Sequence, residues 1–175
     1  VGHCGFAVSR RRLRPDGQVE WGPDKSGPHD HHVPVLTASR ATGELTGILY
    51  NYACHPTSRA GLLVGGDYVG LTHDRLATHF PGVPAGFLQG CGADLKPRPV
   101  DPAATTFVAR EVEEVQWLGD ELGDAVASVI RSGDMRQVCG SVTVQSRPIQ
   151  LETVAPDVAV AKRVLANNER LLGPW

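Results

Sequence analysis

Two apolar runs that end abruptly in polar and glycine-rich residues constrain the fold of this chain most. The runs are Ile48–Cys54 and Ala85–Leu88, and a segment of helical length, Tyr68–Phe80, lies between them. This order of strand, loop, helix, strand and loop is typical of an α/β unit, which carries its functional groups on loops at the carboxyl ends of its strands. His55 follows the first run and Asp94 lies just past the second, so we expect the functional site there.

Length and composition predict a soluble globular domain. The chain has 175 residues, of which 41% are hydrophobic and 21% are charged. The net charge of -2 and the pI near 6.4 give no reason to expect a nucleic-acid partner. No apolar run approaches the roughly 20 residues that span a bilayer, so we expect no transmembrane segment. The chain begins with Val1 and carries no signal-peptide pattern, so we interpret it as an internal piece of a longer protein.

Patterns outside the central stretch predict further strands and helices. The expected elements are a strand over Val1–Val8, a loop over Arg14–Asp30, strands over Val33–Ser39 and Leu45–Cys54 joined by a turn at 41–44, a helix from Val108 to about Arg131, a strand over Val138–Leu151 and a helix over Pro156–Leu172. The run up to Cys54 is apolar at successive positions, which predicts a central strand covered on both faces. We therefore predict an α/β fold, with a mixed β-sheet flanked by helices, in which residues 1–175 form part of a single larger catalytic domain and 131–175 are scaffold.

Each candidate site residue has a structural interpretation beside its functional one. His55 is either a metal ligand or a structural histidine, and Asp94 either orients that histidine or the substrate, or bonds the amides of its own loop. Arg10 either holds an anionic or carbonyl group or belongs to a solvated, ion-paired loop. Gly92 lets the backbone come close to a ligand. Asp67 is placed to cap the helix that follows it.

Histidines and cysteines elsewhere in the chain give weaker signals. His29 and the segment Asp30–His32 form either a surface run or a metal cluster, in which only alternate residues of an extended chain can share one ion. The four cysteines show no CxxC spacing, which argues against a zinc ribbon. Cys54 and Cys91 lie at predicted strand ends, and we interpret them as free thiols in preference to a disulfide.

The motifs NYACHPTS, GGDYVG and FLQGCGADLKP, preceded by FAVSRRR and HDHHVPVL, resemble the catalytic domain of the neutral ceramidases. They are more similar still to a set of bacterial ceramidase-like proteins. The resemblance covers about Val1 to Ile130. It implies a zinc-dependent hydrolase of lipid metabolism that cleaves the amide of a sphingolipid, ceramide, and that is secreted, periplasmic or membrane-associated.

The resemblance also implies roles for individual residues. The family histidine that binds zinc falls on His55, and the family arginine that contacts the substrate region falls on Arg10, although Ser9 replaces the usual asparagine before it. Lys96 stands where the family motif GDxSPN carries its proposed nucleophilic serine. The family's remaining zinc ligands, an upstream histidine and a downstream glutamate and tyrosine, have no match in this chain and are expected elsewhere in the protein.

Together these observations predict a ceramidase-like amide hydrolase with His55 as a zinc ligand, Asp94 and Lys96 as catalytic residues, and Arg10 and Gly92 as substrate-binding residues. A lysine amine is mostly protonated at neutral pH, because its unperturbed pKa is about 10.4. We therefore expect direct attack by zinc-bound water and no acyl-enzyme at Lys96, which is then either an electrophilic helper or a solvated lysine. The alternative is a binding or scaffold protein that kept the fold and lost the nucleophile.

Overall fold

The structure is a computed structural model that describes residues 1–60, 62, 64–153, 155 and 157–166. It divides the chain into two units, Val1–Gln137 and Val138–Trp175. The first unit contains β1 (Gly2–His3), β2 (Ala7–Leu13), β3 (Val19–Asp24), β4 (His32–Val33), β5 (Val35–Ser39), β6 (Leu45–Tyr52), α1 (Asp67–His79), β7 (Ala85–Gln89), β8 (Leu95–Pro97) and α2 (Val112–Ser132). The described part of the second unit contains α3 (Val158–Ala166). No described helix is both long enough and apolar enough to cross a membrane.

The strands of the first unit form three small sheets. A two-stranded sheet pairs β1 with β4, and a three-stranded sheet has the order β3-β2-β8 with antiparallel neighbours. The third sheet has the order β5-β6-β7, in which β5 runs antiparallel and β7 parallel to the central β6. The parallel pair is connected through α1, as the apolar runs and the segment between them predict. The mixed β-sheet flanked by helices is therefore confirmed.

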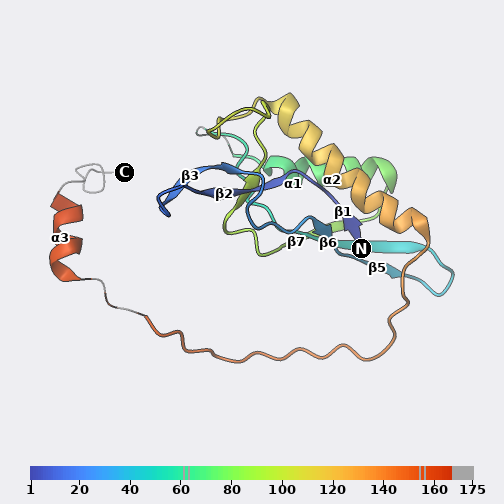
Figure 1. The fold of residues 1–175 in the computed structure, drawn as a ribbon. Helices are drawn as coiled ribbons and strands as arrows, with labels where there is room; N and C mark the ends of the chain where they lie inside the picture. The colour runs from blue at the N-terminus through green and yellow to red at the C-terminus, as the bar shows by residue number, and fades with distance from the viewer. Residues whose placement is uncertain (61, 63, 154, 156, 167–175) are drawn as a thin grey trace. The chain divides into compact units, whose positions relative to one another are not determined.

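Helices α1 and α2 lie side by side on one face of the β5-β6-β7 sheet (Figure 1). Tyr50 of β6, Leu76 of α1 and Leu122 of α2 are among the fully buried residues between them. Two glycines of α2 make the close helix contact possible, because a Cβ atom at Gly119 would lie 2.6 Å from the Cβ of Leu71 in α1. Glycine lowers helix propensity, but here it lets two backbones approach.

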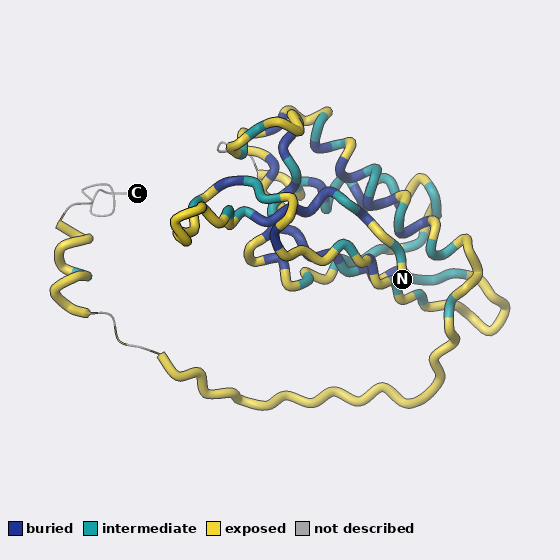
Figure 2. The backbone as a smooth tube through the Cα atoms, viewed as in Figure 1, coloured by how far each residue is buried: buried dark blue, intermediate teal, exposed yellow. Residues whose placement is uncertain are grey.

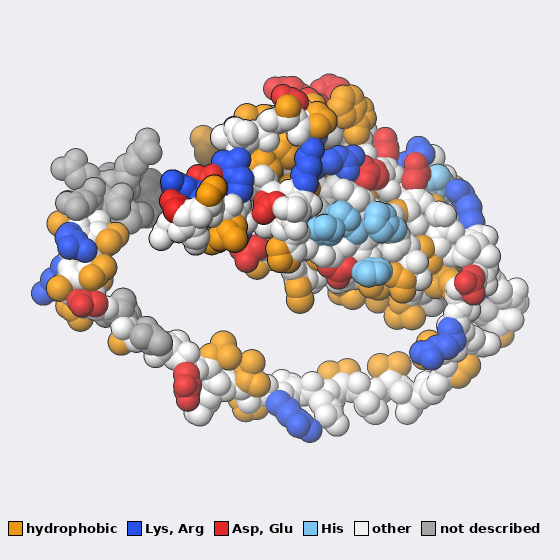
Figure 3. Space-filling model, in the orientation of Figure 1, with side chains coloured by type: hydrophobic (Ala, Val, Ile, Leu, Met, Phe, Trp, Pro, Cys, Tyr) orange, Lys and Arg blue, Asp and Glu red, His pale blue; other side chains and the backbone are white. Residues whose placement is uncertain are grey.

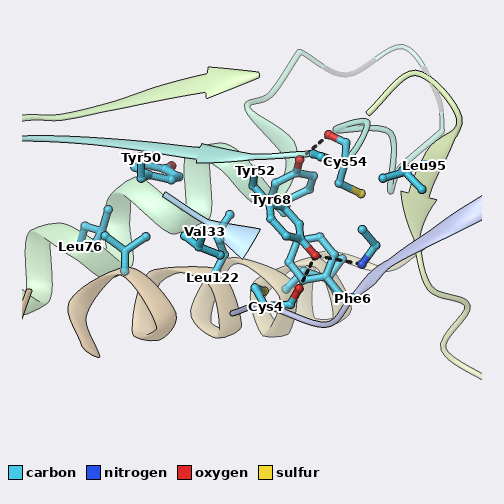
Figure 4. Close-up of a cluster of buried hydrophobic side chains, with 14 of the residues drawn as sticks. Cys4, Phe6, Val33, Tyr50, Tyr52, Cys54, Tyr68, Leu76, Leu95 and Leu122 are labelled. Carbon is cyan, nitrogen blue, oxygen red and sulfur yellow. Dashed lines mark hydrogen bonds between the residues drawn. The ribbon is translucent and has the colours of Figure 1, made fainter. Parts of the chain in front are cut away.

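Two buried tyrosines join the start of β2 and helix α1 to the end of β6 (Figure 4). The Tyr52 hydroxyl donates to the Cys4 carbonyl at 2.8 Å and accepts from the Ala7 amide at 3.0 Å. The Tyr68 hydroxyl of α1 donates to the Cys54 carbonyl at 2.6 Å. Both hydroxyls are therefore satisfied, as a buried polar group requires. These bonds fix the chain on either side of the candidate site, three residues before Arg10 and one residue before His55.

The opposite face of the β5-β6-β7 sheet is open, so the prediction that β6 is covered on both faces is wrong. Leu49 of β6 is 42% exposed and its cross-strand partner Leu36 is 56% exposed. The apolar sequence of β6 therefore reflects burial on the helix side alone, where Ile48, Tyr50 and Tyr52 point.

The segment predicted as a loop, Arg14–Asp30, contains the strand β3, which pairs antiparallel with β2. The prediction is wrong because Gly22 and Pro23 lie inside this strand. The pairing register of β2 with β3 shifts between Ser9 and Arg11 of β2, and this irregularity accommodates the two residues. As a consequence, the arginines expected just after the first strand lie within β2 and face a second strand.

The C-terminal part differs from prediction as well. The segment predicted as a strand, Val138–Leu151, forms neither strand nor helix, and its residues are exposed along its length (Figure 2). Alternating apolar residues such as Val142 and Val144 are 93% and 90% exposed, so the alternation here does not mark a strand with one buried face. The predicted final helix is present as α3, while Pro156 and residues 167–172 of that prediction lie outside the described residues.

All four cysteines are free thiols, as expected. Cys4 and Cys54 are buried, whereas Cys91 and Cys139 are exposed. Burial, with a smaller contribution from the charge of Glu121, raises the pKa of the Cys4 thiol to about 12. Burial also raises the pKa of Cys54. Neither buried thiol therefore forms a nucleophilic thiolate near neutral pH.

Candidate functional site

The parallel pairing of β6 and β7 brings the candidate residues to one edge of the sheet. Tyr52 at the end of β6 pairs with Gln89 at the end of β7, and the Gly90 amide donates to the Tyr52 carbonyl at 3.0 Å. His55 and Asp94 both follow these strand ends. The expected common edge for the two residues is therefore confirmed.

The backbone after β7 holds the ring of His55. The Nδ1 atom of His55 lies 2.8 Å from the Gly92 carbonyl oxygen, which identifies Nδ1 as the protonated donor. The His55 amide donates to the Leu95 carbonyl at 3.1 Å. Within the described residues the Nε2 atom has no hydrogen-bond partner. A histidine held in this way, with one ring nitrogen on a carbonyl and the other available, has the arrangement of a metal ligand.

Gly92 is a backbone support for this histidine. It is buried, and a Cβ atom at this position would lie 2.6 Å from the Cys54 amide nitrogen and 3.0 Å from the Ala53 carbonyl carbon. Its carbonyl also accepts from the Leu95 amide at 2.9 Å. The close approach expected of this glycine is therefore made to the end of β6.

Within the described residues, the Asp94 side chain contacts neither His55 nor the amides of its own loop, and a contact with substrate stays a prediction. Its carboxylate accepts from the Arg11 Nε at 2.9 Å, and its backbone carbonyl accepts from the Arg10 amide at 2.8 Å. The side chains of Arg11 and Asp94 are 50% and 62% exposed, so this ion pair contributes little to stability. Pairing of β2 with β8 brings the arginines to Asp94, whereas the Gly92 carbonyl takes the position beside the His55 ring.

Lys96 lies on β8 opposite Val8 of β2. Its ammonium donates to the carbonyl oxygen of Thr57 at 2.6 Å and to the Thr57 hydroxyl at 2.9 Å. Burial, followed by the charge of Arg10, lowers the pKa of Lys96. The ammonium also lies 5.7 Å from the ring centre of Phe107. Lys96 is therefore a partly buried side chain held by Thr57, and its role as an electrophilic helper or a solvated lysine stays a prediction.

Arg10 forms no ion pair within the described residues. Its guanidinium carbon lies 4.8 Å above the ring of Trp21, and its Nε atom is buried with no hydrogen-bond partner. Its neighbours differ, because Arg11 pairs with Asp94 and Arg12 pairs with Glu20. The ion-paired interpretation of this run therefore fits Arg11 and Arg12, whereas the described residues show no ion pair for Arg10.

Sequence reasoning identifies neither Trp21 nor Thr57, and it does not predict the contacts that Asp67 makes. Asp67 is the first residue of α1, after the N-cap Gly66, and has a φ of 50°. Its carboxylate accepts from the Ser58 and Tyr68 amides, both at 2.8 Å, so it fastens the loop after His55 to the helix. The N-cap assignment is wrong by one residue, and no local signal predicts this longer-range contact.

Histidine side chains gather on the face near β1 (Figure 3). The rings of His29 and His31 stack with their centres 4.1 Å apart, and His31 Nε2 bonds the Ala7 carbonyl at 2.7 Å. His32 pairs with Asp30 at 2.8 Å. Among the residues that the structure describes, here and around His55, no three His, Cys, Asp or Glu side chains are arranged to hold a metal ion.

Comparison with solved structures identifies a related fold. The chain is similar to the neutral ceramidase from Pseudomonas aeruginosa, with a TM-score of 0.57 and 17% identity, over 77% of this chain and 22% of that one. It is similar to a ceramidase complexed with C2, with a TM-score of 0.53 and 20% identity, over 76% of this chain and 23% of that one. No protein-family model and no curated protein matches the chain. The resemblance to the neutral ceramidases is confirmed at the level of fold, and this chain spans less than a quarter of either solved chain.

Proposed function

We propose that this chain is part of a zinc-dependent hydrolase that cleaves an N-acyl amide bond of a lipid-like substrate. The observation that carries the proposal is the orientation of His55. In a fold similar to part of a neutral ceramidase, this histidine follows the central strand, its Nδ1 is held by the Gly92 carbonyl and its Nε2 is left available. That is the arrangement by which proteins fix the tautomer of a metal-binding histidine.

The described residues supply one such ligand. A catalytic zinc site usually has three protein ligands, and no group of three is present among the described residues. The remaining ligands would come from residues other than those described. When bound, zinc supplies Lewis-acid activation of a carbonyl. Residues of this chain would act around it: His55 as ligand, Arg10 and Lys96 as cations beside the substrate, and Asp94 as the anchor of Arg11.

The position of Lys96 favours water as the nucleophile. Its ammonium donates to the carbonyl and the hydroxyl of Thr57, which favours the protonated amine, whereas burial and Arg10 lower its pKa. A protonated amine has no lone pair for attack on a carbonyl. The proposed cleavage is therefore hydrolysis in one displacement, in which the substrate releases a fatty acid and an amine.

Zinc content of the full-length protein tests this proposal. We expect one zinc ion per protein in the wild type and loss of most of it in His55→Ala, with an unchanged circular dichroism spectrum. His32→Ala is the matched control, because it removes an exposed histidine from the other histidine group. It should keep the metal. Zinc retained in His55→Ala would show that this histidine is not a ligand.

The second candidate function is a non-catalytic binding protein, and Lys96 in the place of the family serine favours it. The two functions differ in one measurement on the full-length protein. A hydrolase releases fatty acid from a short-chain N-acyl substrate in a zinc-dependent manner, whereas a binding protein takes up the substrate and releases nothing.

A further inference from the structure

Two cations of the site lie over two aromatic rings that contact each other. Arg10 lies 4.8 Å over the Trp21 ring, and the Lys96 ammonium lies 5.7 Å from the Phe107 ring centre. The rings of Trp21 and Phe107 meet edge to face with centres 6.0 Å apart. We call these four residues the cation–aromatic cluster. It joins residues from β2, β3 and β8 and from the loop before α2.

The positive charge of this cluster has no carboxylate partner within the described residues. Neither Arg10 nor Lys96 forms an ion pair there, and no hydrogen bond from the Arg10 side chain is present. The other arginines that are buried or partly buried in the described structure all have partners. Arg12, Arg75 and Arg98 contact carboxylates, and Arg110 contacts a backbone carbonyl.

The carboxylates of Asp94 and Asp67 are already hydrogen-bonded, and the charge of Asp67 opposes only part of the effect that burial and Arg10 have on the pKa of Lys96. Asp94 accepts from Arg11, and Asp67 accepts from three backbone amides, those of Ser58, Arg59 and Tyr68. Keeping two like charges together in a partly buried position costs free energy unless an anion offsets it. The arginine fork and the third N–H of Lys96 are free to donate to such an anion.

We propose that Arg10 and Lys96 form a subsite for an anionic oxygen group, a carboxylate or a phosphate, carried by the substrate. This inference rests on the proposed function and names its substrate class: an acidic N-acyl compound instead of a neutral one. In this proposal, the lysine that replaces the family serine adds the second cation of the subsite. The rings of Trp21 and Phe107 provide an apolar wall beside the charge, which suits a molecule that combines an acyl chain with an acidic head group.

Binding of three short N-acyl probes to the full-length protein tests the inference by calorimetry. The probes are N-octanoylglycine, its uncharged methyl ester, and N-octanoyl-O-phosphoethanolamine. We expect at least one acidic probe to bind about tenfold or more tightly than the ester, the range expected for hydrogen bonds to charged groups. The acidic probe that binds more tightly identifies the head group as carboxylate or phosphate.

Single substitutions test whether Arg10 and Lys96 cause the preference for the acidic probe. Lys96→Met and Arg10→Gln should each reduce the preference for the acidic probe over the ester by about tenfold. Lys25→Met is the matched control, because Lys25 is exposed and contacts only the Pro102 carbonyl. If Arg10→Gln does not fold, Lys96→Met alone decides.

Equal binding of the ester and both acids, or an unchanged preference in Lys96→Met, would overturn the anionic subsite. This result is distinguishable from failure of the proposed hydrolase. A protein that prefers the acidic probe, loses that preference in Lys96→Met and cleaves none of the probes keeps the subsite and loses the hydrolase.

Discussion

Lys96 and Arg98 stand two residues apart at β8, yet their environments differ in kind. Arg98 makes a two-pronged ion pair with Glu121 of α2, at 3.2 and 2.6 Å, and this hydrogen bonding raises the pKa of Arg98. Lys96 has no carboxylate partner in the described structure, and burial together with Arg10 lowers its pKa. One cation is built into the fold, whereas the other remains available for a ligand. Unpaired charges with a shifted pKa, of the second kind, are typical of functional sites.

Glu121 shows why the first cation is structural. Burial opposes ionisation of this carboxyl, but the Arg98 guanidinium outweighs burial and the pKa of Glu121 lies below its ordinary value. Its Oε1 also accepts from the Gly5 amide at 3.3 Å. The carboxylate thus fastens α2 to the start of β2 and to the end of β8. The Lys96 ammonium, in contrast, donates its hydrogen bonds to a loop residue, Thr57.

Of the changes considered, removal of Glu121 should have the largest effect on the free energy of unfolding. Glu121→Ala leaves the Arg98 guanidinium and the Gly5 amide without their partner, so we expect a loss of about 2 kcal/mol in the free energy of unfolding. The value is at the lower end for a charged hydrogen bond because the Glu121 side chain is 34% exposed. Urea denaturation followed by circular dichroism measures it. A loss below about 0.5 kcal/mol would show that Arg98 is no more structural than Lys96.

Acid should reproduce part of this effect without a mutation. The folded pKa of Glu121 lies below the unfolded value of about 4.3, so its contribution is complete above that value and is lost as pH falls through the folded pKa. The difference in unfolding free energy between wild type and Glu121→Gln should therefore be constant above about pH 5 and shrink below about pH 4. Urea titrations at several pH values test this. A difference that stays constant down to pH 3 would contradict the role of the Glu121 charge.

The contrast between the two cations also shows what the sequence can predict. The elements β6, α1 and β7 are predictable because each is a local pattern with a clear end, such as Pro56 after β6. The common edge of His55 and Asp94 follows from the general topology of an α/β unit. This reasoning requires only the order of elements along the chain.

Side-chain partners are less accessible to sequence reasoning because they join distant segments. The ring pair of Trp21 and Phe107 depends on β3, and the glycine and proline of this strand lead sequence reasoning to predict a loop there. The pair of Arg98 and Glu121 spans the junction of β8 and α2, and nothing in either local pattern distinguishes Arg98 from Lys96. The resemblance to a family marks position 96 as unusual, but only the structure shows that its charge is unpaired.

Substitution of Lys96 should have a smaller effect on the free energy of unfolding than substitution of Glu121. The lowered pKa means that the protonated amine is less favourable in the folded chain than in the unfolded one. This unfavourable contribution is complete below the folded pKa and is relieved as pH rises above it. Lys96→Met removes the charge together with the Thr57 contact, so at pH 7 we expect an unfolding free energy within about 1 kcal/mol of the wild type. A larger loss in urea denaturation would make Lys96 a structural residue like Arg98.

The subtlest expected effect is on the Lys96 amine itself, and the composition of the chain makes it measurable. Only two other lysines are present, Lys25 and Lys162, so isotopic methylation of the amines yields few NMR signals. We expect one signal to titrate below the ordinary lysine value and to disappear in Lys96→Met. In Arg10→Gln its pKa should rise but stay below the ordinary value, because burial is the larger cause and the arginine charge is the smaller one. A Lys96 pKa that does not change in Arg10→Gln would show that the two cations do not influence each other. The cation–aromatic cluster would then hold two independent charges, and the reason for proposing that one anion binds both would be lost.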